Sequence, residues 1–153
     1  MKTIAVFTTV LAVLALGAQA SAAEIAPGDV PFGDDGVVVS LTGGPGDAAK
    51  GAATFKNTKL GNCLACHANK DMAGELFHGD VGPALDGVAE RYSVAELRAI
   101  VSNSKKALTE ETLMPGFYSL ETGKNVDKAF EGKTILSAEQ VEDVVAYLTT
   151  LKE

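Results

Sequence analysis

The sequence contains few of the residues that bind metals or form disulfides. Its 153 residues include two cysteines, two histidines and three methionines. A structural zinc site takes four Cys or His ligands, but Cys66 and His67 are adjacent, and His67 and His78 lack the spacing of a zinc finger. No cysteine lies outside the segment 63–66, so a framework of several disulfides is excluded as well.

Basic residues are in the minority, with 13 Lys and Arg against 20 Asp and Glu. Lys2 belongs to the leader described below, so the remaining chain has 12 basic and 20 acidic residues and a formal charge of −8. This charge argues against nucleic acid and anionic membranes as partners. It is compatible with a cationic patch on a partner protein, and it also keeps an exported protein soluble.

The chain does contain the sequence Cys63-Leu64-Ala65-Cys66-His67. Two cysteines separated by two residues and followed by a histidine form the attachment signature of a c-type haem. The thiols add to the two vinyl groups of the haem, and the histidine then lies under the iron as an axial ligand. We therefore predict one covalently attached haem c per chain, bound through Cys63 and Cys66, with His67 on the iron.

Two other interpretations of the cysteine pair fit the sequence less well. A disulfide between Cys63 and Cys66 would close a very small loop and stabilise little. A thioredoxin-like redox pair requires the motif beside a βαβ pattern, and no such pattern is present.

The N-terminus has the three parts of a secretory signal peptide. Lys2 precedes an apolar run over residues 4–16, and Ala18-Gln19-Ala20 is a cleavage site of small residues. Cleavage two or three residues later would also fit, and an uncleaved anchor is the alternative. We predict a signal peptide over residues 1–20 and a periplasmic location, which agrees with attachment of haem after export.

The rest of the chain divides into an N-terminal extension, residues 21–46, and one domain, residues 47–153. The extension is rich in Pro, Gly and Asp, with a strand-like run at residues 36–41. It either wraps the domain, docks a partner or is a loose leader. Residues 121–136 are expected to form a long surface loop.

Capping residues and apolar periodicity predict three helices in the domain. They begin after Asp47, Ser93 and Ser137. The first runs to about residue 57 and the second frays near Asn103. Gly51 and Phe55 lie one turn apart, so a glycine and an aromatic side chain share one face of the first helix. We expect the last helix to cross the first one on this face.

The loop after the haem motif contains the pair Gly82-Pro83. Such a pair usually marks only a turn. Near a haem, the carbonyl of Pro83 can accept the second N–H group of His67, which would fix the orientation of the imidazole and raise its basicity.

Met114 is the candidate sixth ligand of the iron, because a thioether followed by Pro115 is held in a rigid loop. Most methionines only fill a core, but Met72 follows His67 too closely to reach the opposite face of the haem. His78 is the alternative sixth ligand, and ligation by two histidines would lower the reduction potential.

Together these features resemble class I cytochromes c from about Asp47 to the end of the chain. A narrower similarity, which includes the extension, is to SoxX, the mono-haem subunit of the thiosulfate-oxidising SoxXA complex. The segments that carry it are Ser40-Leu41-Thr42-Gly43, Gly46-Asp47, 62–67, 81–89, 95–98, 113–118 and 142–148.

The resemblance implies a mostly α-helical class I cytochrome c fold, with crossing N- and C-terminal helices beside the haem and His/Met ligation. In that family the SoxA subunit carries the catalytic cysteine. The complex, an L-cysteine S-thiosulfotransferase, couples thiosulfate oxidatively to a cysteine of the carrier protein SoxYZ. SoxX accepts the electrons and passes them to a soluble cytochrome c. This implies a heterodimer with a SoxA-like cytochrome and transient contacts with the other two proteins.

Both cysteines of this chain are used by the haem, so a partner must supply the sulfur nucleophile and no catalytic residue is expected here. Two alternatives stay open: a free-standing class I electron shuttle, and a haem protein that binds gas or peroxide at an open sixth position. Deleting the extension is expected to abolish association with a SoxA-like protein in the first case and to change little in a free shuttle.

Overall fold

The computed structural model describes residues 23–153 except 122, 124 and 129. The predicted signal peptide, residues 1–20, lies outside the described residues. In the described part the structure is helical and contains no strand, and its α-helices are α1 (Ala48–Lys56), α2 (Val88–Arg91), α3 (Val94–Ala107) and α4 (Ala138–Leu148). Short 3₁₀ helices span Pro27–Asp29, Cys63–Ala65 and Lys70–Met72. The prediction of a mostly α-helical protein is confirmed.

The three predicted helix starts are confirmed, each with its capping side chain. The carboxylate of Asp47 accepts hydrogen bonds from two N–H groups in the first turn of α1. Ser93 and Glu96 form a capping box at α3, and Ser137 and Gln140 form another at α4. These side chains satisfy donors that the first turn of a helix leaves without a partner.

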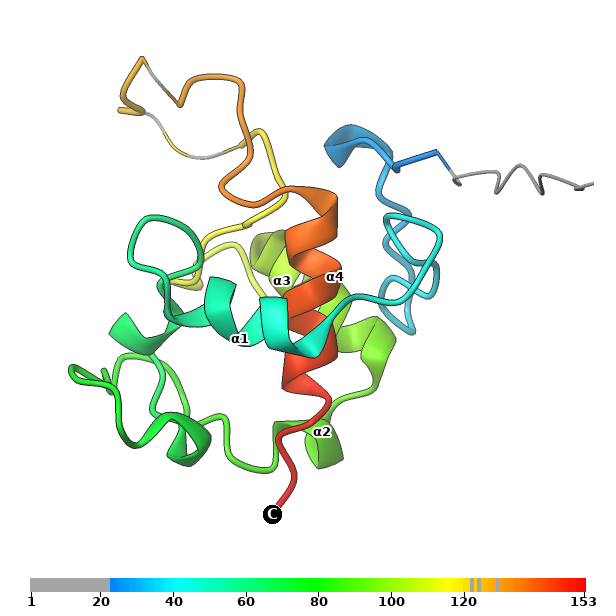
Figure 1. Cartoon of the computed structure of the whole chain (residues 1–153). Coiled ribbons are helices and arrows are strands. Elements are labelled where there is room, and N and C mark those ends of the chain that lie inside the picture. Colours follow the sequence, from blue (N-terminus) through cyan, green and yellow to red (C-terminus); the bar gives the residue numbers. More distant parts are fainter. Residues whose placement is uncertain (1–22, 122, 124, 129) are drawn as a thin grey trace, which may run out of the picture.

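Helices α1 and α4 cross at close range (Figure 1). Gly51 makes the approach possible, because a β-carbon at this position would lie 1.9 Å from the carbonyl oxygen of Asp143. Beside the crossing, the rings of Phe55 and Tyr147 meet edge to face with centroids 5.4 Å apart. The predicted contact between the Gly51/Phe55 face and the last helix is confirmed.

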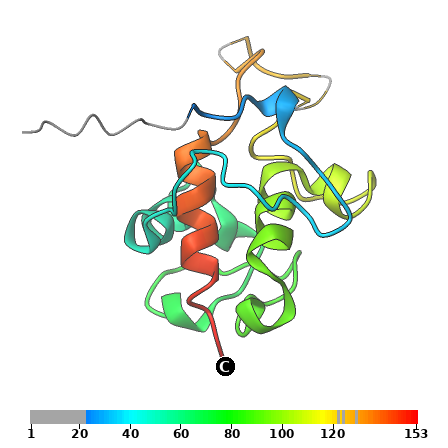
Figure 2. The ribbon, with the colours of Figure 1, turned by 90° about the vertical axis from the view of Figure 1, so that its right-hand side faces the viewer.

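The extension, of which residues 23–46 are described, passes across α3 and α4 (Figure 2). Val37 and Leu41 are fully buried in the core that the helices share. The strand-like run at residues 36–41 does not form a strand, since the segment's only bridge joins Gly33 and Gly36. Its backbone bonds to helix residues instead, as the N–H of Val37 does to the carbonyl of Ala95 at 3.0 Å.

A buried ion pair ties the extension to two helices. Arg98 on α3 donates from Nε and Nη2 to the two carboxylate oxygens of Glu142 on α4, at 2.7 and 3.0 Å. Its Nη1 donates to the carbonyl of Val37 at 2.8 Å, and the N–H of Leu41 donates to Glu142 Oε1 at 2.8 Å. At the start of the extension, the hydroxyl of Tyr118 bonds to the carboxylate of Glu24. The extension is therefore part of the folded core.

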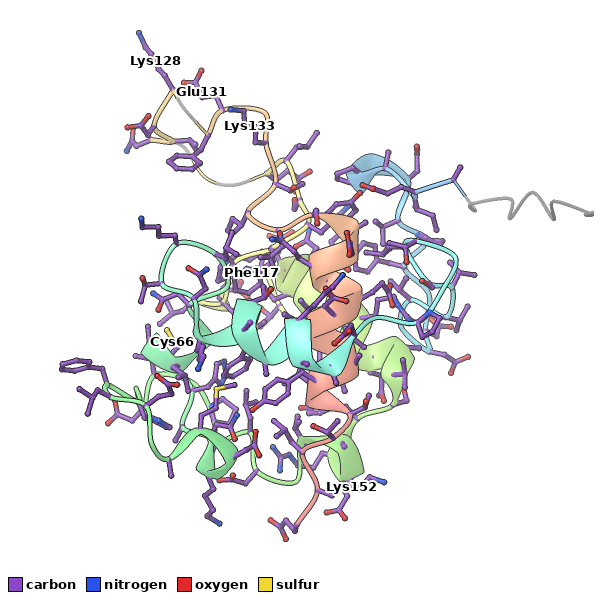
Figure 3. All side chains as sticks on the ribbon, viewed as in Figure 1. Cys66, Phe117, Lys128, Glu131, Lys133 and Lys152 are labelled. Atoms are coloured by element: carbon purple, nitrogen blue, oxygen red, sulfur yellow. The ribbon has the colours of Figure 1, made fainter. Side chains whose placement is uncertain are left out.

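The described residues between 120 and 136 form a loop that extends away from the helices and carries Lys128, Glu131 and Lys133 at its far end (Figure 3). Its apolar residue Phe130 is exposed. In the described ranges, no helix is long and apolar enough to cross a membrane.

Candidate haem site

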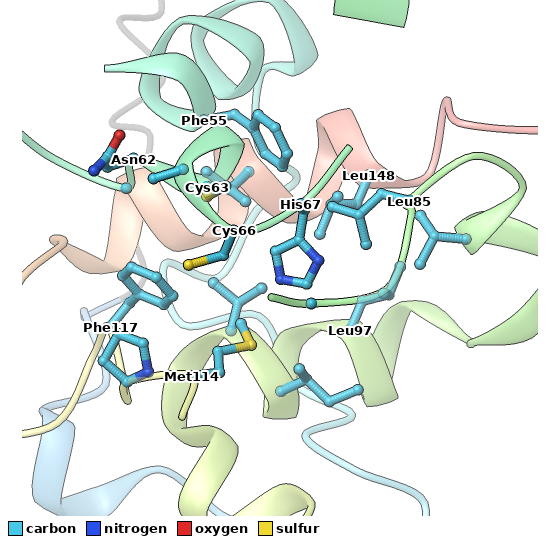
Figure 4. Close-up of a pocket in the computed structure, with 18 of the residues that line it drawn as sticks. Phe55, Asn62, Cys63, Cys66, His67, Leu85, Leu97, Met114, Phe117 and Leu148 are labelled. Atoms are coloured by element: carbon cyan, nitrogen blue, oxygen red, sulfur yellow. The ribbon is translucent and has the colours of Figure 1, made fainter. Parts of the chain in front are cut away.

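A cavity of about 520 Å³ lies between the Cys63–His67 segment, helix α3 and the loop that contains Met114 (Figure 4). Its size falls in the range of roughly 300–1,000 Å³ that is usual for cofactor sites. The walls are mainly apolar, and they include Phe55, Leu85, Leu97, Val101, Phe117 and Leu148. The buried faces of α3 and α4 therefore supply the lining that excludes water.

Cys63 and Cys66 line one wall of this cavity and are not joined in a disulfide. The 3₁₀ turn Cys63–Ala65 brings them to the same side, with the N–H of Cys66 bonded to the carbonyl of Cys63 at 3.0 Å. Gly61 packs closely here, since a β-carbon would lie 3.2 Å from Cys63 Sγ. Burial raises the pKa of the Cys63 thiol to about 12.

His67 points into the cavity from the same wall (Figure 4). Its Nδ1 lies 2.7 Å from the carbonyl oxygen of Pro83. Because a carbonyl can only accept, Nδ1 must carry the hydrogen, which leaves the lone pair of Nε2 available for a metal. Gly82 lies against the ring, and a β-carbon there would be 2.3 Å from Cε1 of His67.

The chain after His67 returns alongside the motif and fixes this arrangement. The N–H groups of Gly79, Gly82 and Leu85 bond to carbonyls of residues 64, 66 and 68 at 2.7, 2.8 and 3.0 Å. At Gly79 the two segments are so close that a β-carbon would lie 2.0 Å from the carbonyl oxygen of Ala65. These backbone hydrogen bonds therefore fix the position of the Pro83 carbonyl relative to His67.

Met114 lines the opposite side of the cavity, and its thioether and the His67 ring project into the same space (Figure 4). Its side chain is half-buried, and its carbonyl accepts a hydrogen bond from Ser104 Oγ at 2.6 Å. Leu113 and Pro115, on either side of it, also line the cavity. The sequence pattern that singled out Met114 thus selected a residue of this site.

His78 does not line the cavity. Its Nδ1 accepts from the N–H of Asn69 at 3.3 Å, and its Nε2 lies 3.0 Å from the carbonyl of Met72. Both ring nitrogens are therefore engaged with the backbone of the loop that follows the motif. This arrangement favours Met114 over His78 as the group opposite His67.

A polar network joins three residues that do not line the cavity. The amide of buried Asn69 donates to the hydroxyl of Tyr147 at 2.8 Å, and this hydroxyl donates to the carboxylate of Asp71 at 2.8 Å. Burial and the bond to Asp71 raise the pKa of Tyr147, so the phenol stays protonated. The network connects the loop after the haem motif to α4.

The residues present fit a covalent haem. Two thiols and one imidazole with a free lone pair share one wall, a thioether faces them, and the space between is apolar. Sequence reasoning did not identify Ser104 or the close contact of Gly82 with His67. The pair Asn103-Ser104 was visible only as the frayed end of a helix, and Gly82 only as half of a turn.

The cytochrome c family model matches residues 48–152. A chain in the crystal structure of SoxXA from P. pantotrophus is 40% identical, covers 86% of this chain and 100% of its own, and superposes with a TM-score of 0.78. Ferric cytochrome c-550 from Paracoccus versutus is 24% identical, with coverage of 71% and 99% and a TM-score of 0.40. Cytochrome c2 from Paracoccus denitrificans is 20% identical, with coverage of 70% and 97% and a TM-score of 0.38. No curated protein matches the sequence.

Proposed function

We propose that this chain is the periplasmic electron-transfer subunit of a thiosulfate-oxidising complex. The premise is that the chain belongs to the cytochrome c family and is a SoxX-type cytochrome. The family and the helical crossing give it the class I cytochrome c fold with covalent haem c. The observation that carries the proposal is the placement of Cys63, Cys66 and His67 opposite Met114 in one apolar cavity.

Each residue of the site has a distinct part in this function. Cys63 and Cys66 would hold the haem covalently, and His67 and Met114 would be the ligands of its iron. When bound, the haem would supply one-electron redox chemistry. Pro83 keeps the imidazole of His67 in one orientation and makes it more basic. The apolar walls exclude water, which limits the rearrangement of solvent when the charge changes.

The chain supplies no sulfur nucleophile for the reaction. Its only cysteines are Cys63 and Cys66, and both belong to the haem motif. Coupling thiosulfate to a cysteine thiol forms one S–S bond and releases two electrons and one proton. We therefore propose that a SoxA-like subunit performs the coupling on a SoxYZ-like carrier. Two electrons then pass through this chain, one at a time, to a soluble cytochrome c.

The first test is spectroscopic and addresses the iron ligands. The oxidised holoprotein should show the weak far-red absorption band of methionine-bound ferric haem, and Met114→Ala should abolish it. His78→Ala should leave the band in place, because His78 does not line the cavity. Absence of the band in the wild type, with binding of CO by the reduced protein, would favour a gas-binding protein instead.

The second test concerns the SoxA-like partner, for which we propose the extension as the docking segment. Val38 and Val39 are 68% and 44% exposed, and the exposed acidic residues Asp34 and Asp35 precede them in the same segment. Deletion of the extension is not a clean test, because residues 37 and 41 bond to the buried Arg98–Glu142 pair.

Substitution of the two outward valines leaves these internal bonds intact. Val38→Asp with Val39→Asp should abolish co-purification with the SoxA-like subunit, whereas Leu120→Asp, at a position that is 53% exposed, should not. Unchanged association in the double variant would remove the extension from the interface. A holoprotein that transfers electrons without any stable partner would instead be a free shuttle.

A further inference from the structure

Helix α3 is broken close to its C-terminal end. Asn103 lies inside the helix but has φ −152° and ψ 91°, which are not helical values. In a regular helix the carbonyls just before it would bond to N–H groups four residues further on. Here the carbonyls of Val101 and Ser102 accept from the N–H groups of Phe117 and Tyr118 at 3.2 and 2.9 Å. The break therefore turns the helix end toward the loop that contains Met114.

The next two residues of α3 bind Met114 itself and a residue that precedes it in the loop. Ser104, which is fully buried, donates from Oγ to the carbonyl of Met114 at 2.6 Å. Lys105 donates from Nζ to the carbonyl of Thr112. The N–H of Met114 in turn points at Thr112 Oγ1, at 3.4 Å. The backbone of Met114 is thus held by Ser104 at its carbonyl, and Thr112, two positions earlier, is held by Lys105.

Asn103 itself fits against the segment after Met114. Its Nδ2 donates to Ser119 Oγ at 3.3 Å, and a β-carbon on Gly116 would lie 3.0 Å from its Oδ1. Asn103 is almost fully buried. A glycine at 116 therefore lets the loop lie directly on the broken helix end, and Pro115 restricts the backbone between this contact and Met114.

We propose that residues 103–105 are a latch that holds Met114 in place, with Ser104 as its principal positioning residue. The inference rests on the proposed role of Met114 as sixth ligand. A thioether is a soft ligand that competes poorly with nitrogen donors for ferric iron. Its residence on the iron then depends on how firmly the protein fixes the methionine, because a backbone that is already ordered loses little entropy when the sulfur binds.

The helix offers a matched control for this latch. Ser102 and Ser104 are both fully buried serines of α3, two residues apart. Ser102 Oγ has no hydrogen-bond partner among the described residues, whereas Ser104 Oγ bonds to Met114. Replacing each by alanine removes the same atoms, but only Ser104→Ala removes a bond to the loop.

The test is a titration of the oxidised holoprotein with imidazole, followed by loss of the far-red band. We expect Ser104→Ala to bind imidazole about three- to tenfold more tightly than the wild type, the effect of losing one hydrogen bond. Ser102→Ala should keep the wild-type affinity, and Ser104→Thr, which retains a hydroxyl, should restore it. The reduction potential should fall in Ser104→Ala and stay constant in Ser102→Ala.

Equal imidazole affinities for Ser104→Ala and Ser102→Ala would overturn the latch. If Ser104→Ala yields no folded holoprotein, Lys105→Met removes the bond to Thr112 at a half-buried position and should tighten imidazole binding in the same direction. Unchanged affinity in that variant would also count against the latch. Failure of the ligand assignment has a different signature, because Met114→Ala would then leave both the band and the imidazole affinity as in the wild type.

Discussion

Arg98 on α3 and Glu142 on α4 form a bidentate ion pair, and their side chains are only 8% and 3% exposed. Removing one member leaves the other charge buried, at a cost of about 3–5 kcal/mol. We expect Arg98→Met to lower the free energy of unfolding by this amount and to release the extension. Denaturant unfolding and proteolysis near residues 30–46 measure the two effects.

The exposed pair Lys50–Glu139 is the control for this loss. Its atoms are 2.9 Å apart, but its side chains are 62% and 67% exposed. Lys50→Met should therefore cost less than about 1 kcal/mol. Equal losses in the two variants would show that burial and the contacts with the extension add nothing to the Arg98–Glu142 pair.

Replacing Gly51 by alanine should lower the stability of the protein, whereas alanine in place of glycine usually stabilises a helix. Alanine normally stabilises a helix by about 1 kcal/mol relative to glycine. At this position its β-carbon would lie 1.9 Å from the carbonyl oxygen of Asp143 and 2.9 Å from Cβ of Tyr147. We expect Gly51→Ala to destabilise the protein by about 1–3 kcal/mol in thermal unfolding, since α1 and α4 must move apart. A gain in stability would mean that the crossing adapts freely.

Gly82 should control the orientation of His67, the proposed axial ligand. Gly82→Ala places a β-carbon 2.3 Å from Cε1 of His67, so the ring must turn or lose its bond to Pro83. We expect less covalent haem per polypeptide and a shifted reduction potential. Gly74→Ala, in the same loop with open space around it, should match the wild type in both measurements.

Tyr118 should make the folded protein less stable as the pH rises into the alkaline range. Burial and the hydrogen bond to Glu24 raise its pKa to about 12, while an unfolded tyrosine titrates near about 10. Its contribution is therefore complete below about pH 10 and is lost as the pH rises to about 12. Over that interval, Tyr118→Phe should lose less stability than the wild type in denaturant unfolding.

The parts of the fold that depend on adjacent residues were predictable. Helix starts depend on a capping side chain and its partner three residues later, as at Ser93 and Glu96. The haem motif is equally local, and Met114 could be selected because few methionines were available. Such features are visible in the sequence since each is complete within a few positions.

The features that were missed join distant residues. An arginine on a helix usually faces solvent, so nothing near Arg98 indicates that it is buried against Glu142 and Val37. The valine run at 37–39 has strand-like residues, but the described part of the chain offers no strand to pair with it, and its backbone meets Ala95 on α3 instead. Ser104 has no local signal either, because its partner Met114 lies ten residues further on.

The bond between Leu41 and Glu142 spans 101 residues. Contacts of such high sequence separation form late and slow the folding of a chain. In the export that we propose for this chain the N-terminus leads, so the core stays incomplete until α4 has crossed, after residues 63–67 have already emerged. The two cysteines, which line the cavity of the folded chain, would then be accessible for haem attachment during an interval that the order of the chain itself provides.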